Sequence, residues 1–204
     1  MFIEQPPVLF RNLYPRALWR IRQEAEKTIY ITFDDGPIPE ATPFILDTLK
    51  RYNIKATFFM VGDNARRYPE LLERVRAEGH RIGNHTFHHF SGARHTIRKY
   101  MADTALANEY LKTDLFRPPH GWMRPTQYYA MRNKYKIVMW DVVTRDYSKH
   151  IDAPDIVRIV KKYTRPGSII TFHDSLKSIE KLRIALPECL EWFITEGYQM
   201  KIIE

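Results

Sequence analysis

The chain of 204 residues contains a single cysteine, Cys189, and only eight glycines. One cysteine excludes an internal disulfide and any zinc site built from several thiolates, so we expect Cys189 to be a small buried hydrophobic residue. The sequence also lacks a Gly-x-Gly-x-x-Gly fingerprint after its first predicted strand and a Walker lysine loop. The usual sequence signals of nucleotide binding are therefore absent.

Long hydrophobic runs are missing as well. No uncharged apolar stretch approaches the roughly 18 residues that a membrane-spanning helix requires. The first dozen residues do not form a signal peptide, because polar residues and prolines interrupt them at Glu4, Pro6, Pro7 and Arg11. We therefore expect a soluble, cytoplasmic protein without membrane contact, and the sequence indicates no particular oligomeric state.

The overall composition is that of an ordinary globular chain, with 44% hydrophobic and 27% charged residues. This composition excludes a disordered tail and a collagen-like repeat, and the length fits one domain. The 32 Lys and Arg residues exceed the 24 Asp and Glu residues, which gives a net charge of +8. Such a surplus favours anionic partners. No nucleic-acid reader motif accompanies it, so we expect no nucleic-acid partner.

Short β-rich runs alternate with amphipathic helical stretches along the chain. We predict strands at 28–33, 56–61, 81–84, 115–117, 137–140, 168–172 and 198–203. We predict helices at about 40–52, 64–78 and 95–111, from near 125, from just after Asp152 to about 163, and at about 179–195. Regular alternation predicts an α/β fold with a parallel sheet. The sheet is either open and doubly wound or closed into a barrel. A barrel of this length would be trimmed or irregular, since eight full units take about 250 residues.

Chemically capable side chains collect directly after the predicted strands. They are Asp34 and Asp35 after the first strand, His85, His88 and His89 after the third, Arg117 to His120 after the fourth, Asp141, Asp146 and Tyr147 after the fifth, and His173 and Asp174 after strand 168–172. In both sheet architectures the active site lies at the carboxyl ends of the strands. These residues are therefore predicted to meet at one edge of the sheet.

The histidines after the third strand have the spacing of metal ligands. His85 and His89 are four residues apart, which puts both imidazoles on one face of a helical turn, although His88 is an alternative to His89. An Asp from another strand end would complete a set that leaves one position open, as in catalytic rather than structural zinc sites. The same triad suits non-haem Fe(II), but oxygenases of that kind are mostly all-β proteins.

The remaining clusters each allow a functional and a structural interpretation. Of the adjacent Asp34 and Asp35, one can bind the metal while the other accepts a proton, or both can belong to an Asx-rich turn. The two prolines before His120 donate no N–H, which leaves the His120 amide as a donor towards the cleft or makes the segment a rigid loop. His173 is either a general acid or a structural histidine.

Taken together and in order, these motifs resemble those of a known family. Thr-Phe-Asp-Asp-Gly, His-Thr-x-x-His, Arg-Pro-Pro-x-Gly, Asp-Tyr and x-x-His are similar to the motifs of the polysaccharide deacetylase (NodB-homology) domain of carbohydrate esterase family four. The resemblance runs from about Thr28 to the C-terminus. It implies an irregular, trimmed (β/α) barrel at 28–204, with residues 1–27 as an N-terminal extension that packs on it. The implied activity is metal-dependent removal of N-acetyl groups from N-acetylglucosamine-containing poly- or oligosaccharides, with release of acetate.

The resemblance also implies a role for each matching residue. It implies a metal, usually zinc with Co²⁺, Ni²⁺ or Fe²⁺ as alternatives, held by Asp35, His85 and His89. The implied catalytic set is Asp34 as base, Arg117 positioning that base, the backbone N–H of His120 as oxyanion donor, His173 as general acid, and Asp146 orienting His173. Pro119, Tyr147 and Thr171 are the implied substrate-binding residues.

Three positions depart from the family pattern, and all of them affect the substrate pocket. The family usually has Trp where this chain has Tyr147, Leu where it has Thr171, and in many members Asp where it has Val143. Two other functions stay open: hydrolysis of a small cyclic imide or amide on the same fold, and carbohydrate binding without catalysis. The complete catalytic set favours the deacetylase.

The N-terminal segment carries apolar residues among basic ones, namely Phe10, Leu13, Tyr14, Leu18, Trp19 and Ile21. We expect this segment to cover the bottom or the side of the barrel. An interfacial helix that meets a membrane or a partner is the alternative.

Overall fold

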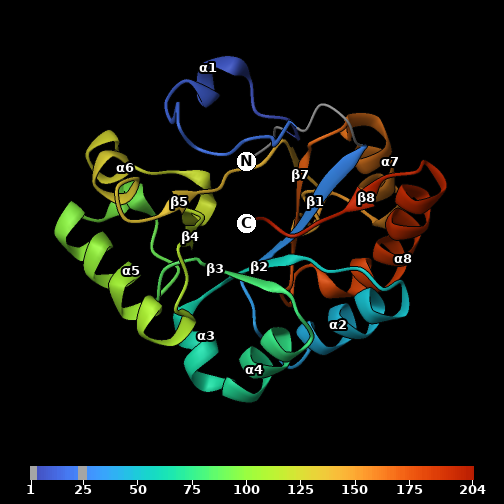
Figure 1. Ribbon diagram of the computed structural model, residues 1–204, viewed down its shortest axis with the longest axis horizontal. Helices are drawn as coiled ribbons and strands as arrows, with labels where there is room; N and C mark the ends of the chain where they lie inside the picture. Colours follow the sequence, from blue (N-terminus) through green and yellow to red (C-terminus); the bar gives the residue numbers. More distant parts are fainter. Residues whose placement is uncertain (1–3, 23–26) are drawn as a thin grey trace.

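Eight parallel strands form one curled sheet with helices on its outer side (Figure 1), in a computed structural model that describes residues 4–22 and 27–204. The strands are β1 (Thr28–Asp34), β2 (Thr57–Met60), β3 (Arg81–Asn84), β4 (Leu115–Phe116), β5 (Lys136–Ile137), β6 (Val142–Val143), β7 (Ile169–His173) and β8 (Gln199–Met200). Their order is β5-β4-β3-β2-β1-β7-β6, and β8 pairs with β1. The prediction of an α/β fold with an irregular, trimmed barrel is confirmed.

The helices follow the predicted alternation, except that the first one, α1, was not among the predicted helices. They are α1 (Val8–Arg11), α2 (Thr42–Arg51), α3 (Gly62–Arg67), α4 (Pro69–Ala77), α5 (Ile97–Leu111), α6 (Pro125–Met131), α7 (Ala153–Tyr163) and α8 (Ile179–Thr195). Short 3₁₀ turns lie at Gly92–Arg94 and Pro119–Gly121.

Three predicted elements differ from the structure. The helix predicted over 64–78 is two helices, because Tyr68 precedes Pro69 and has a non-helical backbone with φ −128° and ψ 61°. The strand predicted at 137–140 ends at Ile137, and a separate strand, β6, follows after the chain bends. The last strand is shorter than predicted and consists of Gln199–Met200 alone.

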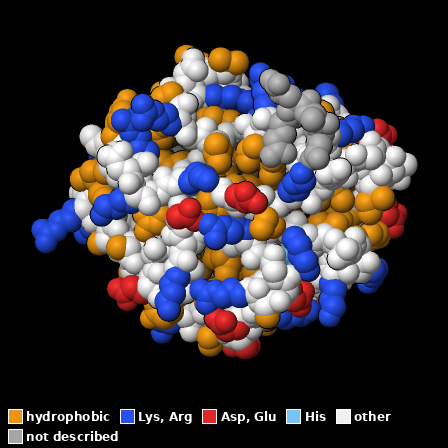
Figure 2. Space-filling model, viewed as in Figure 1, with side chains coloured by type: hydrophobic (Ala, Val, Ile, Leu, Met, Phe, Trp, Pro, Cys, Tyr) orange, Lys and Arg blue, Asp and Glu red, His pale blue; other side chains and the backbone are white. Residues whose placement is uncertain are grey.

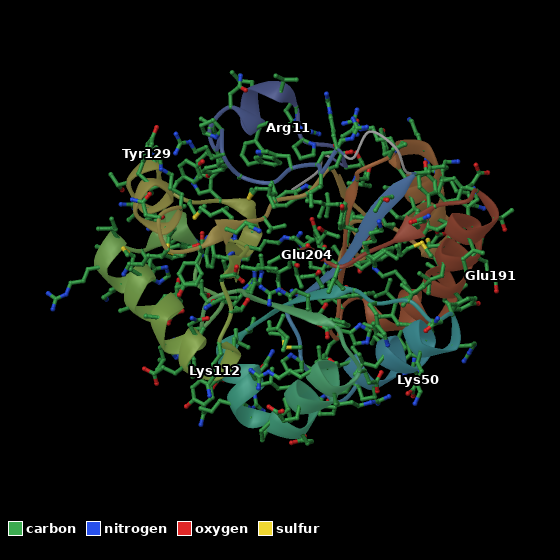
Figure 3. The ribbon with its side chains drawn as sticks, in the orientation of Figure 1. Arg11, Lys50, Lys112, Tyr129, Glu191 and Glu204 are labelled. Carbon is green, nitrogen blue, oxygen red and sulfur yellow. The ribbon has the colours of Figure 1, made fainter. Side chains whose placement is uncertain are left out.

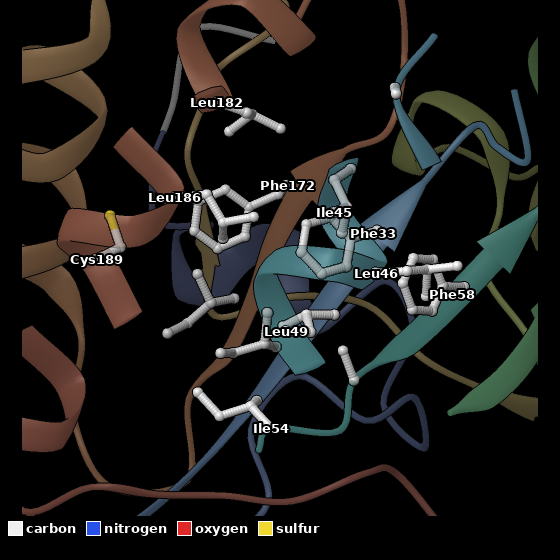
Figure 4. Close-up of a cluster of buried hydrophobic side chains, with 14 of the residues drawn as sticks. Phe33, Ile45, Leu46, Leu49, Ile54, Phe58, Phe172, Leu182, Leu186 and Cys189 are labelled. Carbon is white, nitrogen blue, oxygen red and sulfur yellow. The ribbon is translucent and has the colours of Figure 1, made fainter. Parts of the chain in front are cut away.

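The larger hydrophobic core lies between the sheet and the helices. Successive side chains of a strand point to opposite faces, so Ile29, Ile31 and Phe33 of β1 face outwards. The Phe33 ring stacks between Phe58, at 5.1 Å, and Phe172, at 5.7 Å. Figure 4 shows these rings beside apolar residues of α2 and α8, among them Cys189, which is buried as predicted.

The opposite face of β1 lines the barrel interior. Tyr30 packs there with apolar residues that include Phe59, Ile169 and Ile203. Ile203 is completely buried, and the C-terminus lies near the centre of the ring of strands in Figure 1, as does Glu204 in Figure 3. The amino end of the barrel is therefore filled with hydrophobic side chains, and polar residues occupy its other end.

The N-terminal segment lies between the strands of the open side. The Leu18 N–H donates to the Ile137 carbonyl and the Met139 N–H donates to the Leu18 carbonyl, both at 2.8 Å. The Ile21 N–H donates to the Gly167 carbonyl at 2.9 Å, just before β7. These bonds connect the β5 side of the barrel to the β7 side. Arg11, labelled in Figure 3, reaches from α1 to the buried Asp141.

The basic side chains do not gather in one patch on the face shown in Figure 2. On the face shown in Figure 2, Lys and Arg side chains are scattered and alternate with Asp, Glu and hydrophobic groups. Within the described ranges 4–22 and 27–204, no helix is long and apolar enough to cross a membrane.

Candidate active site

Asp35, His85 and His89 form the group in the described part of the chain that could hold a metal ion. Their ligand atoms all lie within 4.8 Å of one another. The Oδ1 atom of Asp35 is 3.2 Å from Nε2 of His89 and 3.8 Å from Nε2 of His85. The Nδ1 atom of His85 donates to the Arg117 carbonyl at 2.8 Å, which leaves its Nε2 as the ligand atom. One carboxylate and two imidazoles that converge in this way fit a divalent metal.

The helical explanation for the spacing of these histidines is wrong. Residues 85–90 form a loop, in which Thr86 and His89 have left-handed backbones with φ of 62° and 55°. These two left-handed residues, and not a helical turn, bring the His85 and His89 rings together beside Asp35. His88 is not an alternative ligand, because its Nδ1 atom lies 2.5 Å from Oδ1 of Asp103 and points away from the group.

The charge states of the metal-binding residues suit a cation. Burial raises the pKa of the Asp35 carboxyl, but the hydrogen bond from His89 and the nearby His173 and His85 bring it well below its ordinary range. Burial lowers the pKa of His85 well below its ordinary value. Asp35 is therefore an anion and His85 a neutral imidazole, the forms in which these side chains bind metals.

Asp34 lies at the carboxyl end of β1 and faces the barrel interior. Nη1 of Arg117, a completely buried side chain, donates to Oδ1 of Asp34 at 2.6 Å and to Oγ1 of Thr32 at 2.8 Å. Nη2 of Arg117 donates to the Met139 carbonyl at 2.8 Å, and the guanidinium lies 4.1 Å from the ring centre of Phe59. Burial raises the pKa of Asp34, and the Arg117 charge opposes that rise.

His173 ends β7 and is the register partner of Asp34 on β1. Its Nδ1 atom and its backbone N–H both donate to Asp146, each at 2.7 Å, one to each carboxylate oxygen. Burial lowers the pKa of His173, but the Asp146 carboxylate outweighs burial and raises the pKa to about 9. The imidazole is thus held in a fixed orientation and in its protonated form at neutral pH.

The segment after β4 folds over the three metal-binding residues. His120 has a left-handed backbone with φ 60°, and its ring centre lies 4.7 Å from that of His89. Gly121 follows with φ 68°, and a Cβ atom there would overlap the Trp140 ring. The residue after His120 must therefore be glycine, both for its backbone and for the close approach of Trp140.

A cavity of about 510 Å³ joins these groups. The predicted site residues on its wall are Asp34, Asp35, His85, His89, His120, Tyr147, Thr171 and His173. Arg117 and Asp146 are buried behind the wall, and Pro119 is buried without lining the cavity. Tyr147 stands edge-on to His173, with ring centres 4.7 Å apart.

Some residues of this site were not among the predicted site residues. Trp140 and Asp174 line the cavity, and Thr32 connects Arg117 to Thr171 through its hydroxyl. Asp174 directly follows His173 and is among the polar residues that come after strand 168–172, although the sequence predicts no role for it. Thr32 has no such signal, because its position two residues before Asp34 matters only once β1 faces the barrel interior.

Asp141, another polar residue near a predicted strand end, has no part in this cavity. Its buried carboxylate accepts hydrogen bonds from Arg11 at 2.7 Å, from Arg165 at 2.7 and 2.8 Å, and from Ser168 at 2.8 Å. Asp141 therefore connects the N-terminal segment to the loop before β7.

Comparisons with known proteins agree with this geometry. The family model described as polysaccharide deacetylase matches residues 21–138. A peptidoglycan-N-acetylglucosamine deacetylase of Bacillus cereus is 38% identical over 154 residues, which cover 72% of this chain and 56% of that protein. A chitooligosaccharide deacetylase of Azorhizobium caulinodans is 36% identical over 168 residues, covering 76% of this chain and 77% of that protein.

A solved structure extends the similarity to nearly the whole fold. The crystal structure of the Bc1960 peptidoglycan N-acetylglucosamine deacetylase superposes with a TM-score of 0.84 at 32% identity, covering 97% of this chain and 95% of that one. The match of the family model to more than half of the chain agrees with the convergence of the catalytic motifs at one cavity. The chain belongs to the polysaccharide deacetylase family, carbohydrate esterase family four.

Proposed function

We propose that the protein is a metal-dependent hydrolase that removes N-acetyl groups from N-acetylglucosamine-containing poly- or oligosaccharides and releases acetate. The observation that carries this proposal is the pairing of Asp34 with His173 across β1 and β7, on the wall of the cavity that also holds the metal-binding residues. A carboxylate and a protonated imidazole at one cavity are the base and the acid that amide hydrolysis requires. The deacetylase activity of the similar proteins supports the same reaction.

Each residue has a distinct task in this reaction. A divalent metal at Asp35, His85 and His89, which we propose to be zinc with Co²⁺, Ni²⁺ or Fe²⁺ as alternatives, supplies Lewis acidity towards the acetamide carbonyl. Asp34, held by Arg117, accepts the proton of the attacking water. The His120 backbone N–H donates to the oxyanion of the tetrahedral intermediate, as main-chain donors do in other acyl-transfer sites.

Collapse of that intermediate needs an acid. His173 carries a proton at neutral pH because Asp146 raises its pKa to about 9 against the effect of burial. It gives that proton to the departing amine, so the products are acetate and a free amino sugar. Asp146 stays behind the cavity wall and accepts both N–H groups of His173, which fixes the direction of the transfer.

The sugar lies against the remaining wall of the cavity. We propose Tyr147 and Thr171 as direct substrate contacts, because both line the cavity beside His173. Pro119 lies beneath the surface next to His120 and shapes the loop that the substrate meets. In place of the family's usual Trp and Leu, these two side chains each bring a hydroxyl group near the acetyl group.

We propose the same division of the chain as the sequence predicts. Residues 28–204 are the catalytic domain, and residues 1–27 are an extension whose described part, residues 4–22 and 27, packs on it; residues 1–3 and 23–26 lie outside the described residues. The hydrogen bonds of Leu18 and Ile21 across the open side support this division.

Acetate release tests the proposed reaction directly. Zinc-reconstituted protein is incubated with N-acetylglucosamine oligomers and with peptidoglycan, and acetate is measured over time. Asp34→Asn is the blank, and Asp47→Asn is the matched control, because Asp47 is an exposed aspartate on α2 that pairs with Arg74. Release by the wild type and the control but not by Asp34→Asn is the expected result. No release by zinc-loaded wild type would overturn the proposal.

A further inference from the structure

Asp103 on α5 is a buried carboxylate outside the cavity that no step of the proposed reaction uses. The residue is 6% exposed. Its Oδ2 atom accepts the backbone N–H of Phe87 at 2.9 Å and that of His88 at 3.0 Å, and its Oδ1 atom lies 2.5 Å from Nδ1 of His88. All three contacts are made to the loop between the metal-binding residues His85 and His89.

The backbone of this loop has two residues in an unfavourable conformation. Thr86 and His89 both have left-handed φ values, which non-glycine residues adopt only when their surroundings impose them. The backbone N–H groups of the consecutive residues Phe87 and His88 point to the same side of the loop, where Oδ2 of Asp103 accepts both of them. A buried carboxylate that accepts both satisfies two donors that would otherwise be costly to bury.

The opposite side of the loop is held by α3. The Gly62 N–H donates to the Thr86 carbonyl at 2.9 Å, and the Asp63 N–H donates to the Phe87 carbonyl at 3.0 Å. The first turn of α3 thus takes carbonyl groups of the loop, while Asp103 takes its N–H groups. Two shorter-range side-chain contacts also hold the loop: the Thr86 N–H donates to Oδ1 of Asn84 at 2.8 Å, and the Phe90 N–H donates to Oγ1 of Thr86 at 2.9 Å. Asp103 is the contact that comes from a helix, and one substitution removes it without changing the loop sequence.

We propose that Asp103 is a positioning residue for the metal centre, a statement that rests on the proposed function. Its carboxylate holds residues 86–88 so that His85 and His89 direct their Nε2 atoms to the same oxygen of Asp35. Loss of the carboxylate disorganises the metal ligands and leaves the Asp34–Arg117 and His173–Asp146 pairs in place. Partners that orient metal ligands typically change metal affinity about 10–100-fold when they are replaced.

Zinc affinity of the metal-free protein tests this role without any measurement of catalysis. Asp103→Ala, His88→Ala and wild type compete for Zn²⁺ with a chromogenic chelator, and thermal unfolding of the metal-free forms reports on folding. Glu109→Ala is the matched control, since Glu109 is an exposed acidic residue on the same helix. Acetate release is then measured as a function of free zinc.

We expect Asp103→Ala to bind zinc about 10–100-fold more weakly, with kcat at saturating zinc within a few-fold of the wild-type value. His88→Ala should lose less affinity, because both backbone N–H groups keep their acceptor, and Glu109→Ala should lose none. If Asp103→Ala does not fold, Asp103→Asn decides, because it keeps one acceptor oxygen and should show an intermediate loss. Wild-type zinc affinity in a folded Asp103 variant would overturn the proposal. A lack of acetate release by zinc-loaded wild type would overturn the proposed function and leave the affinity result standing.

Discussion

Replacing Asp146 with asparagine should move the pH dependence of the reaction. In the folded protein, burial lowers the pKa of His173, but Asp146 outweighs burial and the pKa is raised to about 9. The difference from the ordinary value of about 6.5 corresponds to about 3 kcal/mol in favour of the protonated imidazole. Asparagine keeps an oxygen for one N–H of His173 but removes the charge. Without the Asp146 charge, only Asp35 and Asp34 oppose burial, and the pKa of His173 should fall towards its ordinary value of about 6.5.

The expected loss of activity depends on the pH at which it is measured. At pH 8, a group with a pKa of about 9 is roughly 90% protonated, whereas one with a pKa of about 6.5 is roughly 3% protonated. If His173 is the general acid, the variant should lose about 30-fold in kcat at pH 8. At pH 5.5 both imidazoles are mostly protonated, so the difference should shrink to a few-fold.

The assay is acetate release between pH 5.5 and 9.5, with saturating zinc and substrate and with Asp47→Asn as control. The basic limb of the profile should lie about 2.5 pH units lower in the variant than in the wild type. Identical basic limbs would refute the assignment of His173 as the acid that Asp146 controls. The same pair affects stability: because the folded pKa is raised, its stabilising effect is complete below about pH 6.5 and is lost as the pH rises through about 9.

Three further substitutions have defined outcomes. Asp34→Asn should lower kcat by at least about 100-fold with near-normal zinc affinity. It should also lower the free energy of unfolding, measured in urea, by about 3 kcal/mol, because Arg117 stays buried without a counter-charge. An active variant would exclude Asp34 as the base. Gly121→Ala should lower both the melting temperature and kcat/KM, since its Cβ overlaps the Trp140 ring and overpacking costs about 1–3 kcal/mol; unchanged values would contradict the close packing. Burial lowers the pKa of His80 to about 4, so the stability that depends on its neutral form is present above about pH 6.5 and lost as the pH falls through about 4. His80→Asn should flatten the unfolding free energy between these pH values, and an unchanged slope in urea titrations would refute this.

The expectation that polar residues after the strands meet at one edge of the sheet predicted most of the polar residues on the cavity wall. Asp34 and His173 lie 139 positions apart, yet each ends a buried strand, and they are the last pair in the register of β1 with β7. Period-two alternation then decides that both side chains face the barrel interior. Neither step needs knowledge of tertiary packing beyond the pairing of parallel strands. The position of the cavity could therefore be predicted from local patterns.

The organisation of the metal-binding loop could not be predicted in the same way. The spacing of His85 and His89 suggested a helical turn, but left-handed backbones at Thr86 and His89 produce the convergence. Such backbones are imposed by contacts from other parts of the chain, here Asp103 of α5 and the first turn of α3. The sequence was sufficient to predict the metal-binding residues. It was insufficient to predict the contacts that position them, because those contacts depend on how the helices pack against the loop.

Arg117 and Asp146, the charged partners of Asp34 and His173, lie apart from the residues proposed to contact the substrate. Burial acts on Asp34 and His173 in opposite ways, raising the first pKa and lowering the second. Arg117 and Asp146 counter these two effects from behind the cavity wall, where a sugar cannot touch them. Substitutions at Tyr147 or Thr171 should therefore alter which glycan is bound while the protonation states of the proposed acid and base persist. In the proposed function, the chain departs from the family pattern at substrate-facing positions and keeps every charged group of the proposed catalytic set.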